Sequence, residues 1–129
     1  MGNLFDLTGK VAVITGSTKG IGKAMAQRMA EHGAKVVISR RKADICDQVA
    51  IEITAAGGTA MAIPCNISDE SQLQNLVDKT IAAWGGIDVL VCNAAANPYY
   101  GPMGDVPDGA YDKTMENNIK RNLWLCNMV

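Results

Sequence analysis

The sequence predicts an α/β fold, a doubly wound parallel sheet with helices on both faces. Three observations lead there. Short apolar runs typical of strands alternate with helical stretches of about ten to fifteen residues, no repeat or linker interrupts this alternation, and a glycine-rich turn joins the first strand to the first helix. Right-handed crossovers then give the strand order 3-2-1-4. The winding reverses between strands one and four, where ligands bind in sheets of this kind.

The strands and helices can be placed in order along the chain. Strands are expected at Val11–Thr15, Lys35–Ser39, Thr59–Pro64 and Ile87–Cys92. Helices are expected at Gly20–Glu31, Ala43–Ala56 and Ser68–Ala83, and from about Asp108 towards the C-terminus, after a loop rich in proline and glycine at Asn97–Asp108. Pro64 should end the third strand because it cannot donate a ladder hydrogen bond, and Ser68 should cap the third helix.

The spacing of apolar residues indicates which face of each helix is buried. In the first helix, Ile21, Met25 and Met29 recur every four residues, and Gly33 follows where a glycine commonly ends a helix. The third helix carries one apolar stripe, made of Leu73, Leu76, Val77, Ile81 and Trp84. The last helix is expected to face the sheet through Tyr111, Met115, Asn118 and Asn122.

The segment after the first strand predicts an anion site. Gly16 permits a tight turn, and Gly20 and Gly22 allow the backbone to approach a phosphate and the helix to approach the sheet. The first N–H groups of a helix lack internal partners and carry partial positive charge, so a pyrophosphate fits there. Glycine-rich turns also occur for structural reasons alone. However, Asn93 follows the fourth strand and would flank the same crevice as Gly16, which favours a nucleotide site.

Composition excludes several classes of protein. The chain has 129 residues, enough for one domain or part of one, with 48% apolar residues, 19% charged residues and a net charge of −1. This composition provides no basic surface for nucleic acid, and the sequence predicts neither a membrane span nor a secretory signal. Cys46, Cys65, Cys92 and Cys126 are too scattered for a metal or redox site, so we expect small buried side chains in a cytoplasmic protein.

Four motifs in the chain resemble those of a known family, in the same order. They are Thr15-Gly-x-x-x-Gly-Ile-Gly22, Cys65-Asn-Ile-Ser68, Asp88-Val-Leu-Val-Cys-Asn-Ala-Ala95 and Tyr111-Asp-Lys-x-x-x-x-Asn118. Together they resemble the N-terminal half of a short-chain dehydrogenase/reductase of the main branch, which has a Rossmann fold. The resemblance implies a nicotinamide-dependent oxidoreductase that forms homo-oligomers. Residues 1–129 would then be the N-terminal part of a single dinucleotide-binding domain, truncated before its later strands.

The resemblance also assigns cofactor-binding residues, which follow the four strands in turn. They are Gly16, Ser17, Thr18, Lys19, Gly20, Ile21, Gly22, Ser39, Arg40, Arg41, Asn66, Ile67, Asn93, Ala94 and Ala95. Asn66 stands where many members carry an aspartate that contacts the adenine amino group. It can accept from that group or instead act as a capping residue ahead of the third helix. Ala95 replaces a glycine of the family, which narrows the floor beneath the cofactor.

The residues after the second strand bear on the choice of cofactor. An acid there would bind the ribose hydroxyls and repel a 2′-phosphate, but the chain has Ser39, Arg40 and Arg41 and no acid before Asp44. Arginine is a permanently charged, forked donor that suits a phosphate, and Lys19 would reach the same phosphate from the glycine turn. A basic loop that is merely solvated is the alternative. We therefore expect NADP(H), with NAD(H) as the weaker candidate.

Asn118 is the one residue here that resembles a member of the family's catalytic set of Asn, Ser, Tyr and Lys. The resemblance implies that it orders a water chain that carries protons to the lysine; a polar residue on an exposed helix face is the alternative. The expected Ser and Tyr-x-x-x-Lys pair are absent, and Tyr99, Tyr100 and Tyr111 have no lysine four residues later.

Two functions therefore remain open at the level of sequence. We expect the complete enzyme to transfer a hydride between the nicotinamide and an alcohol or ketone, and this chain alone to be inactive. A non-catalytic nucleotide-binding module is the alternative if 129 residues is the whole protein.

The last helix predicts self-association. Its apolar residues cover more of the circumference than a surface helix usually shows, and they are Ile119, Leu123, Trp124, Leu125, Met128 and Val129. Large exposed apolar patches are uncommon on soluble monomers, and in the family the corresponding helix packs against its copy in a neighbouring subunit. We expect a homo-oligomer, a dimer or tetramer, through residues 111–129, centred on Trp124 and Met128, although a fifth strand would supply part of the cover.

Overall fold

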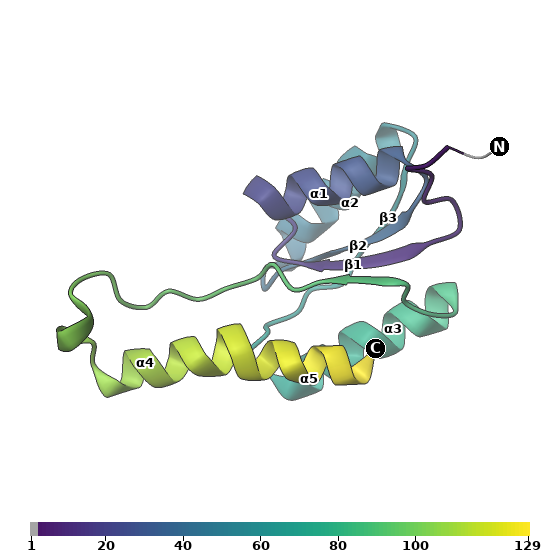
Figure 1. The fold of residues 1–129 in the computed structure, drawn as a ribbon. Helices are drawn as coiled ribbons and strands as arrows, with labels where there is room; N and C mark the ends of the chain where they lie inside the picture. The colour runs from purple at the N-terminus through teal and green to yellow at the C-terminus, as the bar shows by residue number, and fades with distance from the viewer. Residues whose placement is uncertain (1–2) are drawn as a thin grey trace.

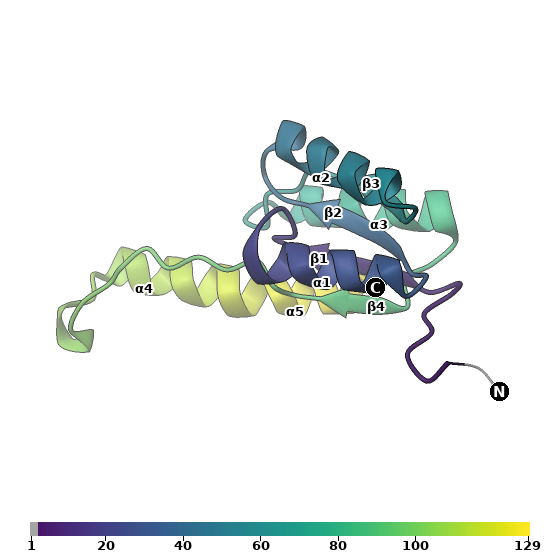
Figure 2. The ribbon, with the colours of Figure 1, turned by 90° about the horizontal axis from the view of Figure 1, so that it is seen from above.

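The computed structural model describes residues 3–129, which form a four-stranded parallel sheet with helices on both faces (Figures 1 and 2). The strands β1 (Val11–Thr15), β2 (Lys35–Ser39), β3 (Thr59–Ala62) and β4 (Val89–Val91) lie in the order β3-β2-β1-β4. The helices are α1 (Gly20–Glu31), α2 (Ala43–Ala55), α3 (Glu70–Trp84), α4 (Asp108–Met115) and α5 (Arg121–Met128), with a 3₁₀ turn η1 (Met103–Asp105) and a π-helical turn η2 (Glu116–Lys120). The predicted fold class and strand order are confirmed.

The strands β1 and β2 form the buried centre of the sheet. Every residue of β1 is buried, and so is β2 after its first residue. The two strands pair in register from Val11 opposite Lys35 to Thr15 opposite Ser39, so both end at the same edge. Strands covered on both faces need continuous apolar runs, and these two segments supply them. Both were predicted to the residue.

Helices α1 and α2 cover one face of the sheet, and α3 and α5 cover the other (Figure 1). Side chains of β1 alternate between the two layers: Ala12 and Ile14 pack with α1 and α2, whereas Val13 packs with α3 and α5. Helix α4 and the loop before it extend beyond the carboxyl edge of the sheet (Figure 2).

Among residues 3–129, no helix has both the length and the apolar character needed to span a membrane.

The third strand ends earlier than predicted. β3 stops at Ala62 rather than Pro64, but pairing with β2 continues through single hydrogen bonds. The Ile63 N–H donates to the carbonyl oxygen of Ile38 at 3.0 Å, and the Cys65 N–H donates to the carbonyl oxygen of Arg40, directly after β2, at 2.9 Å. Pro64 lies between these two donors, and donors to one neighbour alternate along a strand, so its position faces the free edge of the sheet, where a missing N–H breaks no bond to β2.

Two predictions for α3 are wrong. Ser68 is not its N-cap: the cap is Asp69, whose Oδ1 accepts hydrogen bonds from the Ser71 and Gln72 N–H groups at 2.9 and 3.4 Å. Within the helix, Thr80 is fully buried where Ile81 was expected, and Ile81 is 44% exposed. Thr80 tolerates this position because its hydroxyl donates to a backbone carbonyl one turn earlier, at 2.7 Å.

The buried face of α1 lies one residue away from the predicted stripe. Its buried residues are Gly22, Ala26 and Ala30. Ile21 is 75% exposed, and Met25 and Met29 only flank the core. Small residues on the inner face let the helix lie close to the sheet, so apolar size alone misplaced the stripe.

The segments α4, η2 and α5 form one continuous helical rod whose inner face also differs from the prediction. Tyr111 and Met115 are 57% and 39% exposed, whereas Asn117 and Leu125 are buried. Asn117 can face inward because it accepts a hydrogen bond from the Ser68 hydroxyl at 3.0 Å. A buried polar group is tolerated where such a partner exists.

The four cysteines are all free thiols. Cys46 and Cys65 are buried as expected, and Cys92 is half-buried. Cys126 is exposed, so the expectation of buried thiols is wrong at this position. In the described part of the chain, no three His, Cys, Asp or Glu side chains lie close enough together to hold a metal ion.

Candidate functional site

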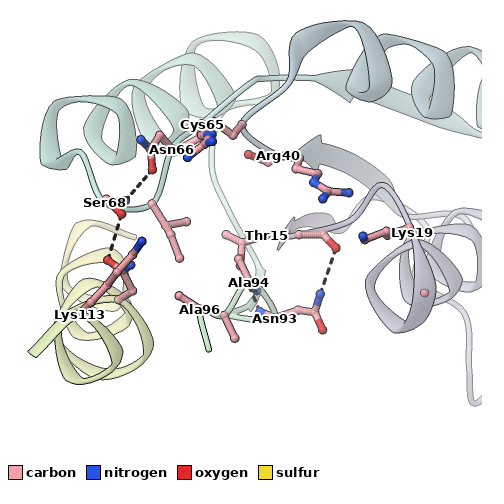
Figure 3. Close-up of a pocket in the computed structure, with 17 residues that line it drawn as sticks. Thr15, Lys19, Arg40, Cys65, Asn66, Ser68, Asn93, Ala94, Ala96 and Lys113 are labelled. Carbon is pink, nitrogen blue, oxygen red and sulfur yellow. Dashed lines mark hydrogen bonds between the residues drawn. The ribbon is translucent and has the colours of Figure 1, made fainter. Parts of the chain in front are cut away.

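A cavity of about 540 Å³ lies at the carboxyl edge of the sheet (Figure 3). It is bounded by the turn after β1, the loops after β2, β3 and β4, and the α4–η2 rod. Its lining residues are Thr15, Gly16, Lys19, Gly20, Ser39, Arg40, Arg41, Cys65, Asn66, Ile67, Ser68, Asn93, Ala94, Ala95, Ala96, Lys113 and Asn117. Segments far apart in the sequence meet here because parallel strands end at one edge, as expected for a ligand site in this architecture.

Glycine conformation shapes the turn between β1 and α1. Gly16 and Gly20 have φ values of +65° and +59°, which other residues rarely adopt. Gly22 lies against the Gly16 carbonyl oxygen, and a Cβ at Gly22 would also sit 2.5 Å from the Asn93 side-chain nitrogen. Among the described residues, no side chain caps the start of α1 at Lys19. The first N–H groups of α1 are therefore available to an anion.

The glycine turn is tied to the loop after β4. The Thr15 hydroxyl oxygen accepts hydrogen bonds from the backbone N–H groups of Asn93 and Ala94, each at 3.0 Å. The Asn93 side-chain amide donates to the Gly16 carbonyl oxygen, also at 3.0 Å. These bonds fix the two loops that the sequence placed on one crevice. Thr15 itself was missed, although it ends β1 directly before the turn.

Ser17 and Thr18 support the cavity from behind. The Ser17 hydroxyl oxygen accepts from the Ser39 N–H at 2.9 Å, and the Thr18 hydroxyl oxygen accepts from Nη1 of Arg40 at 3.1 Å. Both residues are buried. They therefore hold the end of β2 and the Arg40 guanidinium in place rather than line the cavity.

The lining carries positive charge without a carboxylate. Lys19, Arg40, Arg41 and Lys113 contribute cations, and among residues 3–129 no Asp or Glu lines the cavity. Lys113 comes from α4 and was not predicted. Four cations around one cavity favour a ligand with several negative charges.

Most of the predicted cofactor residues line this cavity. They are Gly16, Lys19, Gly20, Ser39, Arg40, Arg41, Asn66, Ile67, Asn93, Ala94 and Ala95. Gly22 is buried behind the turn, together with Ser17 and Thr18, and Ile21 is 75% exposed outside the lining. The contact of each residue with a cofactor stays a prediction.

Asn66 stabilises a local turn and also lines the cavity. Its Oδ1 accepts a hydrogen bond from the Ser68 N–H at 3.0 Å, and its own N–H donates to Oε1 of Gln72 at 2.8 Å. These bonds shape the loop ahead of α3, while Asp69 caps the helix itself. The interpretation of Asn66 as a cap of α3 is therefore wrong, because the residue shapes the loop before the helix, and the ligand-binding interpretation stays a prediction.

Two adjacent asparagines in η2 lie on the side of the cavity opposite the glycine turn, and only one of them lines it. Asn118 lies outside the lining: its Oδ1 accepts from the Ala96 N–H at 2.7 Å, and its Nδ2 donates to the Ala96 carbonyl oxygen at 2.8 Å. Asn117 lines the cavity, is 5% exposed and binds the Ser68 hydroxyl. Asn117, Ser68 and Ala96 were not predicted as site residues. The paired asparagines were the available signal, and π-turns such as η2 often occur at functional sites.

Cys65 contributes a neutral surface to the cavity. Its side chain is buried, and this burial raises its pKa to about 11. The thiol is therefore protonated at neutral pH and is neither a nucleophile nor an anion towards a ligand. Cys65 was predicted to be a small buried side chain and was not predicted as a site residue.

The sequence of this chain matches a known family of proteins. A family model described as short chain dehydrogenase matches residues 10–129. The chain belongs to the short-chain dehydrogenase/reductase family. The prediction from the four motifs is thus confirmed, and the family is one of oxidoreductases.

Curated relatives share about two residues in five with this chain. It is 40% identical over 119 residues to Short-chain dehydrogenase/reductase SDRA from Arabidopsis thaliana, and 41% identical over 117 residues to Tropinone reductase-like 3 from Erythroxylum coca. The matches cover 92% and 91% of this chain but 47% and 45% of those proteins. The chain therefore spans about half the length of these short-chain dehydrogenase relatives.

Solved structures of the family superpose closely. A hydroxysteroid dehydrogenase from Escherichia coli matches with a TM-score of 0.89 and 38% identity, over 97% of this chain and 52% of that one. A metagenomic short-chain oxidoreductase in complex with NADP matches with a TM-score of 0.87 and 34% identity, over 95% of this chain and 55% of that one. These likenesses extend over the whole cavity-bearing fold.

Proposed function

We propose that this chain is the cofactor-binding part of an NADP(H)-dependent oxidoreductase that transfers a hydride between the nicotinamide and an alcohol or ketone. The observation that carries the proposal is the charge of the cavity. Four cations line it, Lys19, Arg40, Arg41 and Lys113, without a carboxylate from the described residues. A dinucleotide with a 2′-phosphate brings three phosphates to such a site, and charge-assisted hydrogen bonds to them are roughly twice as strong as neutral ones.

Arg40 is the residue best placed for the 2′-phosphate. It follows β2 directly, and its Nη1 donates to the Thr18 hydroxyl oxygen at 3.1 Å. This bond fixes the guanidinium at the lining and leaves its other N–H groups for a ligand. Ser39 adds a hydroxyl beside it, and the first acid beyond β2 is Asp44, inside α2. A preference for NADP(H) over NAD(H) of about tenfold or more follows.

The glycine turn suits the pyrophosphate of the same cofactor. Gly16 and Gly20 line the cavity, and the uncapped start of α1 directs peptide N–H groups towards an anion. The cofactor, when bound, supplies or accepts the hydride, and the protein supplies its position and electrostatic surroundings. The relative solved with NADP supports this choice by similarity.

Asn118 is proposed to position the active site. Through its two hydrogen bonds to Ala96, it holds η2 against the loop after β4. The family resemblance adds a role in ordering water that relays protons to a lysine. The Ser, Tyr and Lys expected beside it are not in this sequence. We therefore propose that this chain alone does not turn over substrate.

Self-association is also proposed for the complete protein, as a cytoplasmic dimer or tetramer. Ile119 and Leu123 are 56% and 58% exposed on η2 and α5. Trp124 is half-buried, and its ring is already covered by Lys120 and Arg121, 4.9 and 4.3 Å from its centroid. The contact through residues 111–129 is therefore centred on Ile119 and Leu123 rather than on Trp124.

The test is an assay of the complete protein with NADPH and a panel of small ketones and aldehydes, followed by the absorbance of the reduced nicotinamide. We expect oxidation that depends on the carbonyl compound and is faster with NADPH than with NADH at equal, low concentration. A protein that neither binds NADP⁺ nor oxidises NADPH with any carbonyl compound would contradict the proposal.

A further inference from the structure

Asn117 is a buried side chain with an unused hydrogen-bond donor. It is 5% exposed and lines the cavity from η2. Its Oδ1 accepts from the Ser68 hydroxyl at 3.0 Å, and within residues 3–129 its side-chain nitrogen has no hydrogen-bond partner. That nitrogen is not sealed inside the protein, because the one fully enclosed and unpaired side-chain atom found there belongs to Arg121. Because Asn117 lines the cavity, this unpaired donor is open to a ligand there, and buried amides normally have a partner.

The position of Asn117 indicates which part of a ligand it meets. In Figure 3, Lys19 lies on one side of the cavity and Ser68 on the other, with Arg40 and Asn66 along the rim between them. In the proposed function the pyrophosphate lies on the glycine turn and the 2′-phosphate at Arg40, which leaves the part of the rim at Asn66 and Ser68 for the base. The base is uncharged and carries ring nitrogens that accept hydrogen bonds, which a fixed amide donor suits.

We propose that the side-chain amide of Asn117 donates a hydrogen bond to the adenine base and so contributes to the affinity for the cofactor. This inference rests on the proposed function. The Ser68 hydrogen bond and the burial of Asn117 hold the amide in place before the cofactor binds. Binding therefore orders no flexible side chain, and the contact loses little affinity to entropy.

Two variants and two probes test the contact in the complete protein, by displacement of bound NADPH. Asn117→Leu keeps the size of the side chain and removes its donor, and Asn117→Asp keeps the acceptor for Ser68. The probe 2′,5′-ADP carries the base, whereas pyrophosphate has none. We expect Asn117→Leu to weaken the binding of 2′,5′-ADP by about three- to tenfold and to leave the binding of pyrophosphate unchanged. Asn117→Asp should weaken the binding of both probes, because its carboxylate repels their phosphates. The loss should be larger for 2′,5′-ADP, which also loses the hydrogen bond to its base.

Ser68→Ala serves as the matched control, because it removes the partner of Asn117 without removing the donor. It should weaken 2′,5′-ADP by less than Asn117→Leu does. If Asn117 has a purely structural role, Asn117→Leu and Ser68→Ala should lose equal affinity for 2′,5′-ADP, and pyrophosphate binding should fall in parallel. Either result would overturn the inference, and so would unchanged 2′,5′-ADP binding in Asn117→Leu. If Asn117→Leu fails to fold, equal losses of affinity for the two probes in Asn117→Asp would overturn it. A wild type that binds neither NADPH nor 2′,5′-ADP overturns the proposed function itself.

Discussion

The glycine turn after β1 and the π-helical turn η2 form opposite walls of one cavity, but they are built in different ways. The first wall is backbone: Gly16 and Gly22 bring peptide groups together, and α1 begins there without a side-chain cap. The second wall is the side-chain amide of Asn117, and Asn118 next to it holds η2 against the loop after β4 from outside the lining. A backbone wall suits any phosphate, because peptide N–H groups respond to charge. An amide wall suits partners with donors and acceptors at fixed places.

The two walls should therefore respond differently to substitution. The glycine wall depends on the absence of a side chain, so one added carbon damages it. The amide wall depends on hydrogen bonds, so it tolerates changes in size better than the loss of a donor or acceptor. Graded substitutions separate these two behaviours.

The largest effect is expected at Gly22. A Cβ in Gly22→Ala would overlap the Gly16 carbonyl oxygen and the Asn93 side-chain nitrogen. Overpacking of this kind costs about 1–3 kcal/mol of unfolding free energy, and the displaced turn should weaken the binding of NADP⁺ by more than about tenfold. Gly86→Ala is the control, because a Cβ there meets nothing within 4 Å. Urea unfolding and cofactor titration measure both effects, and equal behaviour of the two variants would contradict a steric wall.

A smaller effect is expected at Asn118. Asn118→Leu leaves the N–H and carbonyl groups of Ala96 without their partners, which are now 2.7 and 2.8 Å away. Leaving such groups unpaired costs about 1–3 kcal/mol of unfolding free energy. Asn122→Ala is the control on the same rod, since it loses one hydrogen bond, to the Asn118 carbonyl oxygen at 2.9 Å. If urea unfolding shows Asn118→Leu to be no less stable than Asn122→Ala, the amide wall is not held as described.

The same contrast explains which features could be predicted from the sequence. β1 and β2 were placed to the residue because strands buried on both faces leave continuous apolar runs. The glycine turn was found because its conformation demands glycine. Asn117 was missed because its inward position depends on Ser68, 49 residues away in the sequence. Apolar size likewise misplaced Ile21, because close helix packing selects the smaller Gly22 for the inner face.

The loop that joins the two walls gives a pH-dependent prediction. Hydrogen bonds from the Ser71 hydroxyl and from the N–H groups of Gln72 and Ser71 lower the pKa of Asp69 below its ordinary value of 3.8. Stability from this cap is therefore present above about pH 4 and is lost as the pH falls through the lowered pKa. Asp69→Ala should reduce the melting temperature by a few degrees at pH 7, and by less at pH 2–3. A melting temperature that falls equally at both pH values would contradict the cap. Ser71→Ala provides the comparison, because it removes the hydroxyl donor to Asp69 and keeps the backbone N–H donor.

The smallest functional effect is expected at Cys65. Because burial raises its pKa to about 11, roughly a thousandth of the thiol is ionised at pH 8. Iodoacetamide should label Cys65 far more slowly in the native protein than in urea, and Cys65→Ala should change NADP⁺ affinity by less than about threefold. Mass spectrometry of the labelled peptides checks the first point. Fast native labelling at pH 8 would show that the thiol is not neutral.

The cations of the cavity are proposed to select a cofactor with a 2′-phosphate. The direct measurement is the ratio of the dissociation constants of NAD⁺ and NADP⁺ for the complete protein, in the wild type, in Arg40→Asp and in Lys42→Asp. Lys42 is exposed and lies outside the lining, so its variant makes the same charge change without touching the site. We predict a ratio of about ten or more in the wild type and in Lys42→Asp, and a ratio near or below one in Arg40→Asp. Equal affinity for the two cofactors in the wild type, or a preference for NADP⁺ that survives Arg40→Asp, would contradict the account.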